Sequence, residues 1–173
     1  MGRLDYQKGF DRLIDAWARL PKHLRQTWRL DIFGQGEWRE TLQEQIQRLG
    51  VEASARINAP TQNIFEEYAA SAFLVMSSHY EGFPMVMIEA MACGLPVISF
   101  DFLCGPRDII RPEENGLIVP EGDVAALSDG MRRLMESPDT LARMSATAPE
   151  VSDTYAETTI MQQWEQLFNA ITQ

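Results

Sequence analysis

The stretch from Ser78 to Ile98 constrains the fold of this chain more than any other. Apolar runs at 72–76 and 97–100 flank it, and each run is typical of a short buried strand. The residues between them begin as a polar loop and continue as a helix, because Pro84 suits a first helical position and Gly94 suits the turn that ends one. The sequence therefore predicts a strand, a loop, a helix and a strand in this order, as in a parallel α/β sheet.

Two acidic residues, Glu81 in the loop and Glu89 in the helix, mark this unit as a candidate binding site. Ligands of open α/β sheets bind at loops that leave the carboxyl ends of strands. The first helical turn also leaves amides unpaired, here those of Phe83 and of the residues from Met85 on, and such amides attract anions. A nucleotide sugar offers phosphates to the amides and hydroxyls to the carboxylates. Alternatively, both glutamates are solvated surface charges, although the apolar neighbours of Glu89 argue for a partner there.

The same patterns predict the other elements. Apolar residues spaced three and four apart predict an amphipathic helix from Phe10 to Leu20, which Pro21 stops. Asn63 and Glu66 have the spacing of a capping box. The expected strands are 28–33, 55–58, 72–76, 97–100 and 117–119, and the expected helices are 10–20, 38–49, 63–68, 84–93, 106–110, 124–135, a short one around 141–144 and a last one at 160–171.

Several motifs together resemble a known family. Glu81 and Glu89, with seven residues between them in EGFPMVMIEAMACGLPV, are similar to the signature of the retaining family 4 glycosyltransferases, which have the GT-B fold. Further matches follow in chain order, namely GRL with QKGF near the start, FGQG at 33–36, GPRDII at 105–110 and ENGL at 114–117. The similarity covers nearly the whole chain. It implies an α/β fold, a Rossmann-like doubly wound parallel sheet flanked by helices, corresponding to the C-terminal half of a GT-B enzyme.

The resemblance implies roles for particular residues. Arg3 and Lys8 would grip the donor diphosphate, Glu81 would accept from the donor sugar, and Glu89 from the ribose. The positive charges of Arg3 and Lys8 fit this role, since an arginine guanidinium can donate two parallel hydrogen bonds to a phosphate and a lysine ammonium offers it a compact positive charge. We therefore expect Arg3, Lys8 and Glu81 to be catalytic, although two unremarkable loop cations remain an alternative for the first pair. The implied donor-binding residues are Gly34, Asn58, Ala59, Gly82, Phe83, Pro84, Met85, Val86 and Glu89.

Two features of that set leave alternatives open. The loop at Ala59 would meet the base through backbone groups, and a plain connecting loop is an equal alternative. Gly34 and Gly36 resemble the start of a dinucleotide fingerprint, but Arg39 stands where the third glycine belongs, which disfavours NAD. His79 has no evident acid partner in the sequence and is not expected to be catalytic.

The resemblance also bears on domain organisation. On this resemblance we expect residues 1–173 to be a single nucleotide-sugar-binding domain that lacks the family's first strand, ahead of Gly2, and its N-terminal acceptor domain. The missing strand would be central, so we expect weak stability or pairing with another chain. We expect the chain alone to bind nucleotide and to transfer little sugar. In this family the last helix packs on the other domain, so its apolar stripe at 160–171 would be exposed here.

Composition excludes several classes of function. The net charge of −10 argues against binding nucleic acid and against a main role as an anchor to an anionic membrane. Cys93 and Cys104 are expected to be buried, reduced thiols, which fits the cytoplasm. The scarcity of histidine and the lack of an Asp-x-Asp motif predict no cofactor and no obligatory metal. Peripheral association with the cytoplasmic face of the inner membrane would involve the missing domain.

These observations favour one function and leave two alternatives. The favoured function is the donor-binding domain of a retaining hexosyltransferase that moves a hexose, with UDP as the first choice of carrier. The acceptor would be a glycan or glycolipid of lipopolysaccharide, capsule or exopolysaccharide synthesis, by analogy with bacterial members of the family. One alternative is a non-catalytic nucleotide-binding or assembly module with structural glutamates. A weaker one is an epimerase of the same architecture, which would need more acid–base residues.

Overall fold

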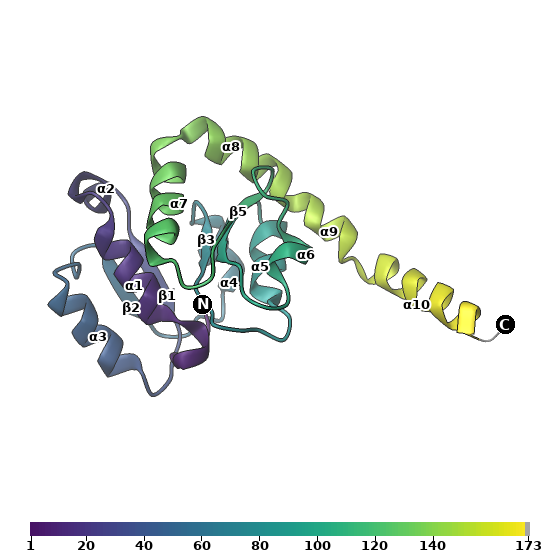
Figure 1. Cartoon of the computed structure of the whole chain (residues 1–173), viewed down its shortest axis with the longest axis horizontal. Helices are drawn as coiled ribbons and strands as arrows, with labels where there is room; N and C mark the ends of the chain where they lie inside the picture. Colours follow the sequence, from purple (N-terminus) through teal and green to yellow (C-terminus); the bar gives the residue numbers. More distant parts are fainter. Residues whose placement is uncertain (172–173) are drawn as a thin grey trace.

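The computed structural model describes residues 1–171, and their strands form two parallel sheets. In the first sheet, β1 (Leu30–Phe33) pairs with β2 (Ala55–Asn58). In the second, β4 (Val97–Phe100) lies between β3 (Leu74–Met76) and β5 (Gly116–Val119). Figure 1 shows the first sheet beside α1 and the second beside α7. The expected strands are confirmed, with ends that differ by one or two residues.

The strands lie in the core because their sequences are apolar. All four residues of β4 are buried, as expected for a strand that has a neighbour on each edge and helices packed against it. Helix α5 (Met85–Ala92) contacts β3 and β4, and α7 (Val124–Glu136) contacts β4 and β5. Helix α1 (Phe10–Arg19) packs against both α7 and α3 (Arg39–Arg48), which joins the two halves of the domain.

The remaining helices are short or peripheral. They are α2 (Lys22–Thr27), α4 (Ile64–Ala69), α6 (Pro106–Ile109), α8 (Pro138–Thr147), α9 (Val151–Thr154) and α10 (Glu157–Ile171), with 3₁₀ turns at Tyr6–Lys8 and Ala148–Glu150. Among residues 1–171, no helix combines the length and the apolar character needed to cross a bilayer.

Two helix starts differ from the expectation. Pro84 is the N-cap of α5 rather than its first helical residue. At α4 the capping box does not form, because the Asn63 amide donates to the Glu66 carboxylate at 3.4 Å and no backbone amide donates to the Asn63 side chain. The Asp123 side chain does cap α7, accepting from the Ala126 amide at 2.9 Å.

The parallel strands flanked by helices agree with the expected fold class, and they are divided into two sheets. Among the described residues no strand lies between β1 and β3, so the two sheets are not joined by a ladder. The N-terminal loop connects them only at their carboxyl ends. The Gly2 amide donates to the Phe33 carbonyl at 3.0 Å, and the His79 amide donates to the Gln7 carbonyl at 2.8 Å. The carboxyl ends of both sheets therefore meet at this loop.

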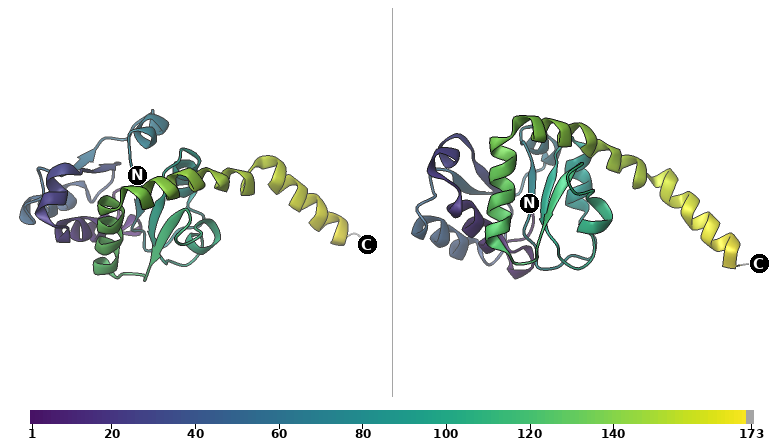
Figure 2. Two further views of the ribbon diagram at one scale, coloured as in Figure 1. Left: turned by 90° about the horizontal axis from the view of Figure 1, so that it is seen from above. Right: turned by 45° about the horizontal axis from the view of Figure 1, so that its top comes forward.

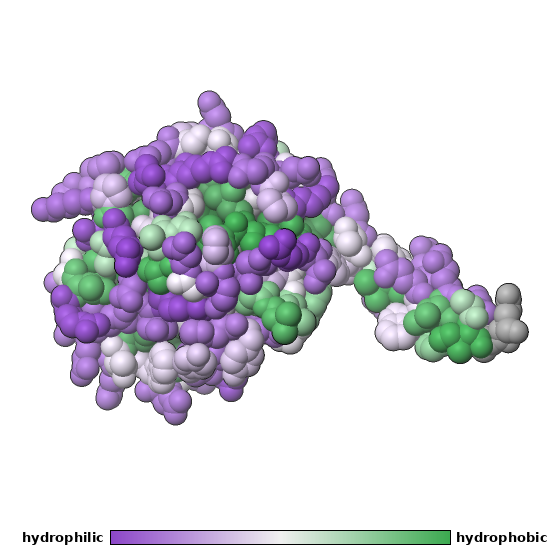
Figure 3. Space-filling model, viewed as in Figure 1, coloured by the Kyte–Doolittle hydropathy of each residue, from purple (hydrophilic) through white to green (hydrophobic). Residues whose placement is uncertain are grey.

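The last helix extends away from the rest of the molecule. Figures 1 and 2 show α10 projecting from the end of α9, and Figure 3 shows apolar residues gathered on it. None of its described residues is buried. The expected exposure of the apolar stripe is confirmed, and its packing on another domain stays a prediction. The exposed apolar residues of α10 are Met161, Trp164, Leu167, Phe168 and Ile171.

Both cysteines are free thiols, but the expectation that they are buried was wrong. Cys93 is the C-cap of α5, where the helix leaves the core. Cys104 lies between β4 and α6 with a left-handed backbone (φ 66°), a conformation typical of exposed turns. Both thiols are therefore accessible to solvent.

Candidate functional site

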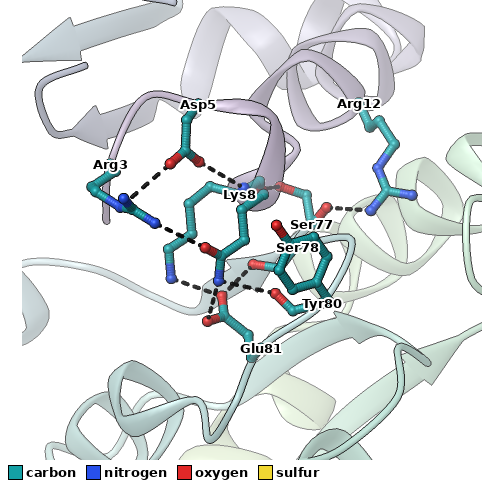
Figure 4. Close-up of polar contacts among 9 residues, drawn as sticks. Arg3, Asp5, Lys8, Arg12, Ser77, Ser78, Tyr80 and Glu81 are labelled. Atoms are coloured by element: carbon teal, nitrogen blue, oxygen red, sulfur yellow. Dashed lines mark hydrogen bonds and ion pairs between the residues drawn. The ribbon is translucent and has the colours of Figure 1, made fainter. Parts of the chain in front are cut away.

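The loop after β3 and the N-terminal loop meet through a buried ion pair. The Lys8 Nζ atom lies 2.7 Å from Glu81 Oε1, and the two side chains are only 18% and 8% exposed. Lys8 ends the 3₁₀ turn Tyr6–Lys8, and Glu81 lies between β3 and α5 (Figure 4). Gly9 makes the approach of the two loops possible, because a Cβ at that position would lie 2.2 Å from the Ser77 carbonyl oxygen.

Two neutral side chains complete the surroundings of the Glu81 carboxylate. The Ser78 hydroxyl donates to Oε1 at 2.7 Å, and the Gln7 amide donates to Oε2 at 3.3 Å. Glu81 thus accepts from three side chains, which holds an ionised carboxylate in one orientation. Figure 4 shows Lys8 and Ser78 converging on it.

Arg3 lies at the rim of this cluster. Its guanidinium pairs with Asp5 at 3.3 Å and donates to the Gln7 side-chain oxygen at 3.0 Å, and its side chain is 73% exposed. Since Gln7 also donates to Glu81, Arg3 is linked to that carboxylate through one side chain (Figure 4). The guanidinium is therefore free to reorient toward a ligand in a way that Lys8 is not.

Glu89 is half-buried and has a partner, so it is not a solvated surface charge. The Tyr68 hydroxyl of α4 donates to Glu89 Oε2 at 3.3 Å. Burial raises the pKa of Tyr68, and the nearby Glu89 charge raises it further, so the phenol stays protonated and donating. The apolar neighbours of Glu89 had predicted a partner, but its identity was not evident from the sequence.

Two adjoining pockets connect these groups. The first has a volume of about 370 Å³ and the second of about 290 Å³, and both include Met1, Gly2 and Ile64. The first is also lined by Lys8, Tyr68, Glu81, Phe83, Pro84, Met85, Val86 and Glu89. The second is also lined by Arg3, Phe33, Gly34, Gln35, Pro60 and Thr61. Lys8, Glu81 and Glu89 therefore line one pocket, and Arg3 lines a second pocket that shares three of its residues with the first.

The start of α5 lines the first pocket without a side-chain cap. Its amides are not all unpaired as expected, since Met85 donates to the Phe83 carbonyl at 3.0 Å. The reason is the backbone of Pro84, whose φ of −84° and ψ of 74° form an inverse γ-turn. A ligand that took the Met85 amide would have to open this turn.

Of the other expected donor-binding residues, Gly34 lines one of these pockets and the rest do not. Gly34 lines the second pocket and lies against Gly2, whose carbonyl oxygen would be 2.0 Å from a Cβ at position 34. The close approach expected from this glycine is thus to the chain's own N-terminal loop. Asn58 donates to Asp31 at 3.0 Å, and neither it nor Ala59 lines either of these two pockets, while Gly82 is exposed in the loop before α5.

Sequence reasoning missed several lining residues. Pro60 and Thr61 occupy the place expected for Asn58 and Ala59, two positions further along the same loop. Gly2 lies inside a quoted motif, but it was given no role. Tyr68 carried a usable signal, because a tyrosine within a helical apolar face needs a hydroxyl partner when it is buried.

Among residues 1–171, no three histidine, cysteine or acidic side chains lie close enough together to hold a metal ion.

Comparisons with known proteins agree with this geometry. The family described as Glycosyl transferases group 1 matches residues 1–151. An exopolysaccharide phosphotransferase of Streptomyces coelicolor is 40% identical over 98% of this chain and 18% of its own length. The amylovoran biosynthesis glycosyltransferase AmsD of Erwinia amylovora is 36% identical over 98% of this chain and 47% of its own length.

A solved structure gives the same result for the fold. HepE of Anabaena in complex with UDP superimposes with a TM-score of 0.85 at 26% identity, covering 98% of this chain and 48% of that one. The present chain thus spans less than half the length of each of these three proteins. Because the family match covers most of the sequence, the chain belongs to the glycosyl transferases group 1 family.

Proposed function

We propose that this chain is the donor-binding domain of a glycosyltransferase that moves a hexose from a UDP-sugar to a glycan or glycolipid, with retention, in cell-surface polysaccharide synthesis. The observation that carries the proposal is the pocket shared by Lys8, Glu81, Glu89 and the uncapped start of α5. A cation and a helix N-terminus suit a diphosphate, and carboxylates suit sugar hydroxyls. UDP is the favoured carrier because it is bound in the HepE structure. The similarity to AmsD, an amylovoran biosynthesis glycosyltransferase, supports a role in polysaccharide synthesis.

Lys8 has the central role in the proposed mechanism. Without a donor it is held by Glu81, and with a donor it turns to the diphosphate, where negative charge grows as the glycosidic bond breaks. Arg3 reaches the same phosphates from the rim. Loss of one such contact in the transition state typically costs about 3 kcal/mol.

Glu81 and Glu89 bind different parts of the donor. Once Lys8 leaves, Glu81 is still oriented by Ser78 and Gln7, so it accepts from hydroxyls of the donor sugar. Glu89, held by Tyr68, accepts from the ribose. We assign Glu81 no covalent role. Retention follows a same-face substitution in which the leaving phosphate takes the acceptor proton.

The acceptor would bind to a part of the enzyme outside this chain, since the relatives are more than twice as long. The isolated chain then binds nucleotide but transfers sugar far more slowly than an ordinary enzyme. Peripheral association with the inner membrane through that other part stays a prediction. The alternative of a non-catalytic assembly module has one supporting observation, the exposed apolar stripe on α10.

Calorimetry with UDP, GDP and ADP tests the proposal. We expect UDP to bind, and Glu89→Gln to weaken it by about tenfold because one ribose hydrogen bond to a charged acceptor is lost. Glu44→Gln on the exposed face of α3 is the matched control and keeps the wild-type affinity. No binding of any of the three nucleotides would favour the assembly module, and equal binding by wild type and Glu89→Gln would contradict the role of Glu89. Ordinary transfer rates by this chain alone would contradict the role of a second domain.

A further inference from the structure

Arg39, the first residue of α3, is exposed, yet its guanidinium is held by the backbone of other elements. It donates to the Ile57 carbonyl at 3.0 Å, to the Gly34 carbonyl at 3.3 Å and to the Asn58 carbonyl at 3.4 Å. Fixing a long side chain in this way costs rotamer freedom, which the three hydrogen bonds must offset. The contacts therefore point to a role for Arg39 in shaping the backbone around it.

The three carbonyls lie at the carboxyl ends of two strands. Gly34 directly follows β1, and Ile57 and Asn58 are the last two residues of β2. The two chains are also joined there by the backbone, since the Gly34 amide donates to the Asn58 carbonyl at 3.2 Å. Because a guanidinium presents several N–H groups in a rigid plane, one arginine can contact both strands at once. Arg39 therefore links the ends of β1 and β2.

These strand ends carry two walls of the second pocket. Residues 33–35, at the end of β1, form one wall, and residues 60–61, in the loop after β2, form another. That loop has a hydrogen bond of its own, from the Asn63 amide to the Thr61 hydroxyl at 3.0 Å, but this bond lies within the loop. Arg39 lines neither pocket, so it acts on the second pocket through the backbone that it holds.

The second pocket suits the base of a nucleotide. Apolar side chains of Phe33, Pro60 and Ile64 line it, and such side chains can cover the faces of a planar heterocycle. The adjoining first pocket holds the charged groups that suit phosphates and hydroxyls. Under the proposed function, the second pocket is thus the part of the site that takes the base. The separation of its walls then decides how well a one-ring base and a two-ring base fit.

We propose that Arg39 is a positioning residue for the base of the donor. By holding the end of β1 to the end of β2, it sets the second pocket for a one-ring base such as uracil and favours UDP over a purine nucleotide. This role rests on the proposed function, since it assigns the pocket to the base of the same donor. Arg39 itself does not contact the donor, which separates its role from those of Arg3 and Lys8 at the phosphates.

The test uses Arg39→Met, which keeps an apolar stem of similar reach and removes every N–H donor of the side chain. Arg56→Met is the matched control, because Arg56 is an exposed arginine of β2 that lines neither pocket. Calorimetry with UDP and with ADP measures binding, at a temperature well below the melting temperature of each variant. NMR relaxation of the Ala59 and Thr61 amides, recorded without nucleotide, measures the order of the loop.

We expect Arg39→Met to lower the affinity for UDP by about tenfold, because the loop must then be ordered at the moment when the base binds. The affinity for ADP should fall much less, since the pocket is not set for a purine, so the ratio of the two affinities should fall as well. The Ala59 and Thr61 amides should become more mobile. Arg56→Met should match the wild type in each of these measurements.

Two results would overturn the proposal. One is unchanged mobility of the Ala59 and Thr61 amides in Arg39→Met. The other is an equal loss of affinity for UDP and ADP, which would show that Arg39 acts through its charge on the phosphates or through general stability. Failure of the wild type to bind UDP would instead contradict the proposed function. The relaxation measurement needs no nucleotide, so it still tests whether Arg39 orders the loop, and the two failures are distinguishable.

Discussion

At the scale of single residues, the Lys8–Glu81 pair links stability to function. Each charge is mostly buried and depends on the other, since the side chains are 18% and 8% exposed. Removal of one partner leaves an uncompensated charge, whereas removal of both does not. Lys8 is also proposed to bind the donor phosphate. A double-mutant cycle can therefore separate its contribution to stability from its contribution to binding.

In that cycle, Lys8→Met should destabilise the chain by up to about 3 kcal/mol, because Glu81 stays charged and loses its cation. The double variant with Glu81→Gln should recover most of this stability but not UDP affinity. Urea denaturation and calorimetry measure the two quantities. Recovery of UDP binding in the double variant would show that Lys8 acts only through Glu81.

Gly34 is a residue at which the backbone leaves no space for a side chain. In Gly34→Ala the Cβ would lie 2.0 Å from the Gly2 carbonyl oxygen, which must move. We expect a loss of about 1–3 kcal/mol in unfolding free energy, as for overpacking elsewhere. In the control Gly82→Ala, the new Cβ meets no atom within 4 Å, so the unfolding free energy should stay unchanged. Equal losses of unfolding free energy in the two variants would contradict the close approach of Gly34 to the Gly2 carbonyl.

The Met1 amino group predicts a dependence of stability on pH. Its pKa is about 6 in the folded chain and 8.0 when unperturbed, so the unfolded chain binds more protons between these values. The unfolding free energy should therefore rise from pH 6 to pH 8 and be lowest below pH 6. Denaturation at several pH values measures this rise, and acetylation of the amine should flatten it.

His79 is the control group for that experiment. Burial lowers its pKa, and Arg12 lowers it further, so its contribution to stability has the same sign. His79→Gln removes this contribution and leaves that of Met1. If the rise disappears in His79→Gln and survives acetylation, the assignment to Met1 is wrong.

At the scale of elements, local pattern was sufficient for most of the fold. The apolar run 97–100 predicted β4 with its observed ends, and Asp123 predicted the start of α7. Features that depend on other parts of the chain were not evident. The ion pair of Lys8 and Glu81, for example, joins residues that are 73 positions apart in the sequence. The exposure of both cysteines follows from where α5 and β4 end in the assembled domain.

Helix α10 is an element that the domain does not need for its own core. None of its described residues is buried. Deletion of residues 156–173 should change the melting temperature little and should reduce self-association, because the exposed apolar stripe is removed. Differential scanning calorimetry and sedimentation measure the two effects. A large fall in melting temperature would show that α10 packs on the domain in solution.

At the scale of the whole molecule, the domain has one site at the carboxyl ends of two separate sheets. The N-terminal loop contacts both sheets and forms a wall of both pockets. A change that displaces residues 1–8 should therefore weaken donor binding, since ordering the loop then costs free energy at the moment of binding.

The most direct measurement of the central claim compares UDP with uridine by calorimetry, in wild type and in Lys8→Met. The account predicts that UDP binds at least about tenfold more tightly than uridine, since the phosphates meet Lys8 and the start of α5. It also predicts that Lys8→Met removes most of this difference. Equal affinities for UDP and uridine in wild type, or an undiminished difference in Lys8→Met, would contradict it.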